Sequence, residues 1–226
     1  MRIAICVPCR DMVHSAFCFD LAKMVAYHGM NSDDEIVLLQ MPGTLIFDQR
    51  EKLAREAMEL GADAILWIDS DMRFPSDMLG GMLMRNVPIL GVNATTRREP
   101  ILPTAQNLEI KGDKHIWHKV STRGKKGIEK VTAVGFGVSL TRKEVFEKMP
   151  APWFDILWTD SGGIIGEDVH FCIKALDNGI PTYVDHDLTP FIKHIGMTEY
   201  GQEHIKYGSD KLQRSKKHNR LLSSQD

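Results

Sequence analysis

The fold is decided by the stretch Ala64-Ile65-Leu66-Trp67-Ile68-Asp69-Ser70-Asp71. The apolar run over 64–68 predicts a strand that is buried on both faces, as strands of parallel sheets are. Ligands bind open α/β sheets at the carboxyl edge, where this strand ends. Two carboxylates there repel each other unless something neutralises them, and Mn²⁺ or Mg²⁺ prefers such oxygen ligands. The alternative is an ordinary turn that uses Asp and Ser.

Short apolar runs and segments of helical spacing alternate on both sides of this strand. The alternation predicts right-handed βαβ units, and therefore an α/β fold with a mainly parallel sheet flanked by helices. The expected strands are 3–7, 35–39, 64–68 and 89–92, and the expected helices are 15–29, 48–60 and 76–84. We expect Ser15 and the capping-box pair Asp48 and Glu51 to begin the first two helices, and Gly29 and Gly61 to end them.

The alternation ends near Thr95. Residues 108–117 are typical of a β-hairpin, and the sequence STRGKKG over 121–127 predicts a basic, flexible loop. The later expected strands are 131–134, 138–140 and 182–184, and the later expected helices are 143–148 and 167–178. Residues 206–226 carry six Lys or Arg against two Asp. The predicted organisation is one α/β domain over residues 1–200 and a polar, basic C-terminal tail over 201–226.

Composition and charge exclude several classes of protein. The 226 residues are 43% hydrophobic and carry 28 Lys and Arg against 30 Asp and Glu, a formal net charge of -2. This balance supports a folded core, and a protein held to nucleic acid by overall charge is usually far more basic. No apolar run approaches the roughly 20 residues of a membrane span. The four cysteines give no disulfide framework, so a cytoplasmic location is expected.

Further charged residues fall at the expected ends and inward faces of helices. Glu167 and Asp168 open an expected helix, where the helix dipole stabilises two acids. The glycine-rich loop before them, residues 160–166, is a candidate for movement over a substrate. Arg50 lies on the inward stripe of its helix, where a guanidinium group needs an anion such as a nucleotide phosphate. His194 taken alone is more often a hydrogen-bonded structural histidine than a ligand.

In their order along the chain, these segments resemble the GT-A glycosyltransferases, which use nucleotide-sugar donors and are built on a Rossmann-like sheet. The resemblance covers roughly Arg2 to Gly196. Small enzymes of this pattern occur in bacteria and phages, and a phage-encoded chain would work in the host cytoplasm. The matching segments are Ile5–Arg10, Asp48–Arg50, Ile65–Pro75, Gly135–Leu140, Gly166–Cys172 and His194–Gly196.

The resemblance implies roles for the matching acids and the late histidine. Asp71 and His194 would bind Mn²⁺ or Mg²⁺, and Asp69 would bind the ion or the ribose and sugar hydroxyls of the donor. The cation would bridge the two phosphates of a UDP- or GDP-sugar and stabilise the charge on the leaving diphosphate. In inverting members the Asp of the E-D pair takes the proton of the acceptor hydroxyl. By resemblance, Asp168 would have this role here. Glu167 would orient the acceptor or support that base.

Pro8, Arg10 and Arg50 would line the nucleotide, again by resemblance. Many relatives place an acid that contacts the base after the second strand, but no Asp-rich motif follows residues 35–39, so the nucleotide stays open. The acceptor stays open as well, between a glycan, a small molecule and a modified DNA base, and so does the inverting or retaining outcome. Arg97 and Arg98 are further candidates for contact with the diphosphate or the acceptor.

Three other functions compete with this interpretation. A nucleotidyltransferase also pairs carboxylates with Mg²⁺, but it normally needs a glycine-rich loop after the first strand, and Pro8-Cys9-Arg10-Asp11 has no glycine. A non-catalytic module that binds a sugar or a nucleotide would use the acids only to stabilise helix ends. A thiol oxidoreductase would use Cys6 and Cys9, which have C-x-x-C spacing, although spacing alone is weak evidence.

Overall fold

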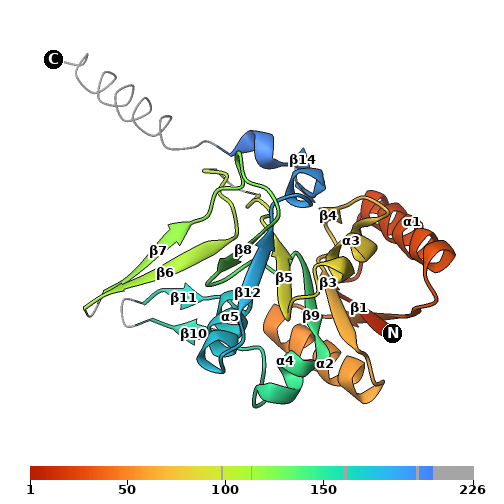
Figure 1. The fold of residues 1–226 in the computed structure, drawn as a ribbon, viewed down its shortest axis with the longest axis horizontal. Helices are drawn as coiled ribbons and strands as arrows, with labels where there is room; N and C mark the ends of the chain where they lie inside the picture. Colours follow the sequence, from red (N-terminus) through yellow and green to blue (C-terminus); the bar gives the residue numbers. More distant parts are fainter. Residues whose placement is uncertain (98, 113, 160–161, 197–198, 206–226) are drawn as a thin grey trace.

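The computed structural model describes residues 1–97, 99–112, 114–159, 162–196 and 199–205. Its centre is a seven-stranded sheet with helices on both faces (Figure 1). In spatial order the strands are β2 (Glu35–Pro42), β1 (Arg2–Cys9), β3 (Ala64–Ile68), β9 (Val138–Arg142), β5 (Ile89–Val92), β12 (Thr182–Asp185) and β8 (Ile128–Val131). Five of these strands run in one direction, and β9 and β8 run in the other. The predicted α/β fold with a mainly parallel sheet is confirmed.

The central strand β3 is buried on both faces, as predicted. Ile65 and Trp67 belong to one apolar cluster, and Leu66 and Ile68 belong to the other, because successive side chains of a strand point to opposite faces. The helices α2 (Ile46–Glu59), α4 (Lys143–Lys148) and α5 (Glu167–Asp177) contribute to the first cluster. The helices α1 (Ser15–Asn31) and α3 (Met78–Met84) contribute to the second. The sheet is therefore covered by one layer of helices on each side.

The first helix differs from its prediction at both ends. Ser15 is the first helical residue of α1, and the capping position before it is His14, with no side-chain hydrogen bond to the helix. The helix runs past Gly29 to Asn31, whose side-chain amide donates to the Tyr27 carbonyl at 2.7 Å. The predicted cap at Ser15 and stop at Gly29 are both wrong.

The capping box predicted for the second helix is also wrong. α2 begins at Ile46, before Asp48, and no side chain caps it. Asp48 instead forms an ion pair with Lys52 at 2.7 Å. Glu51 accepts a hydrogen bond from the backbone amide of Trp153 at 2.7 Å. An ion pair within α2 and a tertiary hydrogen bond have therefore taken the two side chains that the local pattern assigned to the helix end.

Small sheets stand beside the main one. The predicted hairpin forms and is longer than expected, with β6 (Gln106–Lys111) and β7 (Lys114–Lys119). β10 (Leu157–Trp158) pairs with β11 (Ile164–Ile165), and neither strand was predicted. The strand expected over 131–134 ends at Val131 as β8, and Ala133 forms only an isolated bridge with Gln106. A three-stranded sheet joins β14 (Glu199–Tyr200), β13 (Lys193–Ile195) and β4 (Met72–Arg73), and it positions the site described below.

The described chain ends after a short 3₁₀ helix, η2 (Gln202–His204). The Gln202 side chain donates to the Asn93 carbonyl at 2.5 Å, so this segment contacts the end of β5. Of the predicted tail over 201–226, residues 206–226 lie outside the described residues, and the boundary at residue 200 stays a prediction. Within the described ranges, none of the helices combines the length and hydropathy that a bilayer crossing requires.

Candidate functional site

The candidate site lies at the carboxyl edge of β3, where the chain leaves the sheet at Asp69. β4 follows at once and pairs with β13, so that Met72 lies opposite His194. The backbone amide of Ile195 donates to the Asp71 carbonyl at 2.7 Å. This pairing, which no local pattern in the sequence indicates, brings His194 against Asp71.

One ring nitrogen of His194 is hydrogen-bonded to the backbone, and the other is directed at Asp71. Its Nδ1 atom lies 2.8 Å from the Thr95 carbonyl oxygen, which can only accept, so Nδ1 carries a proton. In the neutral ring, Nε2 then presents its lone pair to the Oδ1 atom of Asp71 at 3.2 Å. That oxygen is buried and has no hydrogen-bond partner among the described residues. Two facing lone pairs fit a metal cation, because metal-binding histidines are usually held through their other ring nitrogen in this way.

The other carboxylate oxygen of Asp71, Oδ2, lies 2.6 Å from the Nη1 atom of Arg97. Burial raises the pKa of Asp71, but His194, when its ring is protonated and donates to the carboxylate, and the charge of Arg97 lower it more, so the pKa lies below its usual range. Asp71 is therefore an ionised carboxylate, the form that binds a metal. Arg98, the neighbouring candidate, lies outside the described residues.

Arg50 is buried at the centre of the site, with 2% of its side chain exposed. Its Nη2 atom donates to Asp69 Oδ1 at 2.8 Å, and its Nε atom donates to Glu167 Oε1 at 3.1 Å. Its Nη1 atom donates to the Phe136 carbonyl at 3.3 Å, and the Trp67 and Phe136 rings lie 5.7 and 5.6 Å from the guanidinium carbon. Arg50 thus joins the end of β3 to the start of α5, and its predicted contact with a nucleotide phosphate stays a prediction.

Asp69 is directed at Arg50 in this arrangement. Burial raises its pKa, and the Arg50 charge opposes that effect. Among the described residues, no group of three or more His, Cys, Asp or Glu side chains is arranged to hold a metal. The structure therefore brings together two of the three predicted ligands, Asp71 and His194, and leaves Asp69 on the guanidinium group. Two protein ligands suffice for a cation that takes its remaining oxygens from water and phosphates.

Glu167 and Asp168 are the first residues of α5, as expected from the sequence. Burial, together with the neighbouring charge of Glu167, raises the pKa of Asp168 to about 6. One Asp168 oxygen, Oδ1, accepts a hydrogen bond from the Val169 amide at 2.7 Å. Lys119 of β7 lies near enough for the charge of Asp168 to raise its pKa, which burial lowers more strongly. A partly buried carboxyl group with this pKa has the properties of a general base.

The charges of the site do not cancel. Its four carboxylates belong to Asp69, Asp71, Glu167 and Asp168, and they face three cationic side chains, Arg50, Arg97 and Lys119. The excess is negative, which favours a cation as a further component.

The predicted nucleotide residues and the C-x-x-C pair lie at the end of β1, the strand beside β3. Pro8 is buried within β1, and Arg10 is exposed directly after it. Cys6 and Cys9 are free thiols, and both are buried. Burial raises the pKa of the Cys6 thiol far above its usual range, which is the opposite of what a reactive cysteine needs. This geometry weighs against the thiol oxidoreductase alternative.

Sequence reasoning missed three residues of the site: Thr95, Phe136 and Lys119. Thr95 and Phe136 act through their backbone carbonyls, so their side chains carry no signal of the role. The glycine beside Phe136 is a partial indication that the chain passes close to the site. A Cβ atom at Gly137 would lie 3.3 Å from the sulfur of Met72 and 3.6 Å from Asp69. Lys119 lies at the end of an expected hairpin, and nothing local to it indicated a position near α5.

No protein-family model and no curated protein sequence matches this chain. Three solved structures share its fold. A197 from STIV has a TM-score of 0.52 and 16% identity, over 87% of this chain and 86% of that one. GalNAc-T7 with UDP, GalNAc and Mn²⁺ has a TM-score of 0.52 and 9% identity, over 81% of this chain and 41% of that one.

The catalytic domain of Drosophila β1,4-galactosyltransferase 7, solved with xylobiose, has a TM-score of 0.50 and 16% identity. The match covers 86% of this chain and 71% of that domain. The chain therefore has a GT-A-like α/β fold, which it shares with the catalytic domains of glycosyltransferases. Likeness at this level of identity establishes the fold, and the activity has to be argued from the site.

Proposed function

We propose that the protein is a metal-dependent glycosyltransferase that moves a sugar from a UDP- or GDP-sugar to a hydroxyl group of an acceptor. The observation that carries the proposal is the pairing of His194 with Asp71 beside the Asp69–Arg50–Glu167 bridge. It combines a place for a cation with a carboxyl group of raised pKa, Asp168, one residue beyond the bridge. A metal-dependent transfer that inverts the sugar centre uses both parts.

On the donor side, Asp71 and His194 would hold Mn²⁺ or Mg²⁺. The bound cation supplies positive charge that stabilises the diphosphate as it leaves. Asp69 would reach the ion or the hydroxyl groups of ribose and sugar, and Pro8 and Arg10 at the end of β1 would line the nucleotide.

On the acceptor side, Asp168 would remove the proton of the attacking hydroxyl group. With a pKa of about 6 it is mostly ionised at neutral pH and still basic enough to take that proton. Glu167 would orient the acceptor, because Arg50 fixes one of its oxygens. Arg50 would hold the carboxylates of Asp69 and Glu167 in place, and its contact with a nucleotide phosphate stays a prediction.

The ligands of two structural neighbours are consistent with this proposal. GalNAc-T7 was solved with UDP, GalNAc and Mn²⁺, and the galactosyltransferase domain was solved with xylobiose. The acceptor of this protein stays open between a glycan, a small molecule and a modified DNA base, and a cytoplasmic location stays an expectation.

The test is a panel of UDP- and GDP-sugars incubated with the full chain and Mn²⁺, with released UDP or GDP as the readout. Because most such enzymes slowly hydrolyse their own donor, we expect release from one donor and none in the presence of EDTA. Binding of UDP with Mn²⁺ but no release from any donor would favour the non-catalytic binding module. If the protein neither binds UDP with Mn²⁺ nor releases UDP or GDP from any donor, the proposal is refuted.

A further inference from the structure

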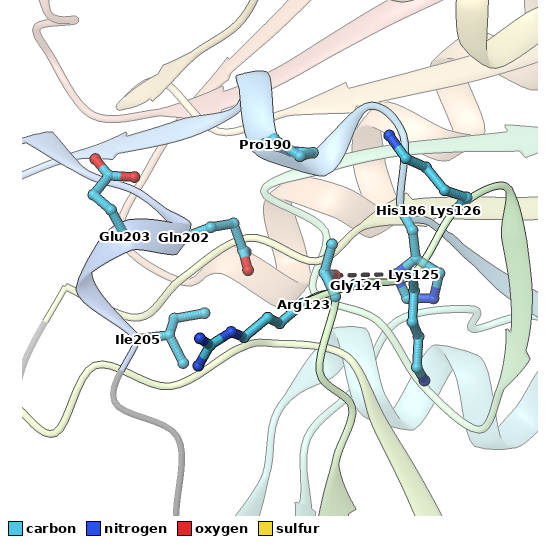
Figure 2. A pocket seen from close by; sticks show the side chains of 10 residues that line it. Arg123, Gly124, Lys125, Lys126, His186, Pro190, Gln202, Glu203 and Ile205 are labelled. Carbon is cyan, nitrogen blue, oxygen red and sulfur yellow. Dashed lines mark hydrogen bonds between the residues drawn. The ribbon is translucent and has the colours of Figure 1, made fainter. Parts of the chain in front are cut away.

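A cavity of about 620 Å³ lies between the loop over 121–127 and the segment that contains η2 (Figure 2). It is lined by the cations Arg123, Lys125 and Lys126, and by the apolar residues Pro190 and Ile205. The proposed transfer reaction uses none of these residues. A cavity of several hundred Å³ with a few charged groups is typical of a small-molecule site.

Buried polar groups hold the loop in place. The Asn93 amide donates to Thr122 Oγ1 at 3.0 Å, and that hydroxyl donates to His186 Nδ1 at 3.0 Å. His186 Nε2 donates to Glu129 at 2.9 Å, and the His186 backbone amide donates to the Gly127 carbonyl at 2.8 Å. The loop predicted to be flexible is thus anchored at both ends. Its cations are positioned before a ligand arrives, which lowers the entropy cost of binding.

The turn that presents these cations depends on glycine. Gly124 and Gly127 have φ angles of 75° and 68°, in the left-handed region that other residues rarely adopt. Between them the chain turns tightly enough for both Arg123 and Lys126 to line the same cavity.

Cationic side chains outnumber acidic ones among the described lining residues of the cavity. Lys125 is neutralised by Glu129 at 2.5 Å. Lys126 is exposed and forms no ion pair within the described part of the chain. Arg123 extends toward Ile205 (Figure 2). Among the described lining residues, Glu203 is the one acid, and its Oε1 atom lies 3.6 Å from the Nδ1 atom of His204.

We infer that this cavity is a second ligand site, which binds the phosphate group of a small phosphorylated molecule. Arg123 and Lys126 would bind the phosphate, and Pro190 and Ile205 would contact the less polar part of the same molecule. Phosphate fits because guanidinium and ammonium groups bind its oxygens by charge-assisted hydrogen bonds. A small molecule is favoured over a nucleic acid, since the cations line an indentation with apolar walls and the whole chain has a net charge of -2.

The cavity and the candidate active site share the segment that follows β5. The Asn93 carbonyl accepts the Gln202 amide at 2.5 Å at the cavity, and the Thr95 carbonyl holds His194 at 2.8 Å at the site. The segment Asn93–Thr95 therefore connects a lining residue of the cavity, Gln202, with the residue that orients His194.

The test is calorimetry on the full chain without divalent cations. The probes are a hexose 6-phosphate, the same hexose without phosphate, and a single-stranded oligodeoxynucleotide. We expect saturable binding of the hexose phosphate alone, weakened by added salt. Arg123→Ala and Lys126→Ala should each weaken it about tenfold or more, since a charged hydrogen bond contributes about that factor. Lys130→Ala, an exposed lysine of β8 outside the cavity, is the matched control and should leave binding unchanged.

Melting temperatures separate lost binding from lost folding, and the fold should tolerate Arg123→Ala and Lys126→Ala because both side chains are exposed. Three results would overturn the inference: no binding of the hexose phosphate, equal binding by the Lys126→Ala and Lys130→Ala variants, or binding of the oligonucleotide only. Because donor hydrolysis depends on Asp71 and is measured separately, either proposal can fail while the other stands.

Discussion

The Nε2 atom of His194 faces the Oδ1 atom of Asp71 at 3.2 Å, while the opposite ring nitrogen is bound to the Thr95 carbonyl. The pairing of β4 with β13 sets this geometry, because it places Met72 opposite His194. The histidine cannot turn away from the carboxylate without losing its backbone hydrogen bond. The pair is therefore ready to receive a cation.

Replacing Asp71 by Ala should abolish Mn²⁺-dependent binding of UDP and leave the fold intact. The carboxylate contributes charge at the end of β3 and little packing, and His194 keeps its bond to Thr95. Calorimetry with UDP and Mn²⁺ measures the effect. Asp77→Ala is a matched control, since Asp77 is exposed and makes no capping hydrogen bond. Unchanged affinity for UDP and Mn²⁺ in the Asp71→Ala variant would contradict the assignment of Asp71 as a metal ligand.

Asp168→Asn should lower kcat by about 10²–10⁴-fold with nucleotide affinity nearly unchanged, the usual effect of losing a general base. The rate of the native enzyme should fall as the pH drops through about 6, because the carboxylate is then protonated. The pH profile of kcat is measured on the native enzyme, and kcat and UDP affinity are measured on the Asp168→Asn variant. A folded variant with near-normal turnover would make Asp168 structural and would favour the retaining outcome.

The same substitution should stabilise the protein at neutral pH, by roughly 1–3 kcal/mol. The folded pKa of Asp168, about 6, lies above its value in the unfolded chain, so ionisation costs stability as the pH rises from about 4 through 6. Asn removes that cost and retains an acceptor for the Val169 amide. Urea unfolding at pH 4 and pH 7.5 tests this, and a gain that is equal at both values would contradict the assigned pKa.

Arg50→Met should destabilise the fold by about 3–5 kcal/mol, because it leaves the Asp69 and Glu167 carboxylates without their buried cation. Adding Asp69→Asn and Glu167→Gln to this variant should recover much of the loss. Lys52→Ala on the same helix removes only an exposed ion pair with Asp48 and should cost at most about 1 kcal/mol. Denaturant titration compares the variants, and equal effects of the two single substitutions would show that the bridge does not stabilise the fold.

The double variant Cys6→Ala with Cys9→Ser should keep transferase activity within an order of magnitude. Both thiols are buried, and the pKa of Cys6 is raised, so neither is prepared for redox chemistry. The readout is the donor turnover assay. Activity that disappears from a folded, UDP-binding variant would restore the thiol hypothesis.

How much was predictable depended on how local the signal was. The strand Ala64–Ile68 and the acids that follow it were evident, because burial on both faces and the D-x-D spacing occupy one continuous stretch. Glu167 and Asp168 were also evident, because the two acids stand together in the first turn of the helix that they begin. The position of His194 was not, since it depends on pairing between β13 and β4, which lie far apart in the chain.

Arg50 shows the limit most clearly. Helical spacing predicted that it faces inward and needs an anion, and this is confirmed. Spacing could not show that the protein itself supplies two carboxylates, because Asp69 and Glu167 meet only after β3 and α5 have packed. Likewise, β9 runs against its neighbours in the centre of the sheet, and an alternation of strands and helices carries no information on strand direction.

The excess of carboxylates over guanidinium groups at the site has a kinetic consequence. A nucleoside diphosphate that approaches alone meets the four carboxylates of Asp69, Asp71, Glu167 and Asp168, and only three cations among the described residues of the site offset them, Arg50, Arg97 and Lys119. Like charges at this range slow its entry, whereas a divalent ion is drawn in. Under the proposed function, assembly is ordered: the metal arrives first or together with the nucleotide, and the free diphosphate departs readily once the metal leaves.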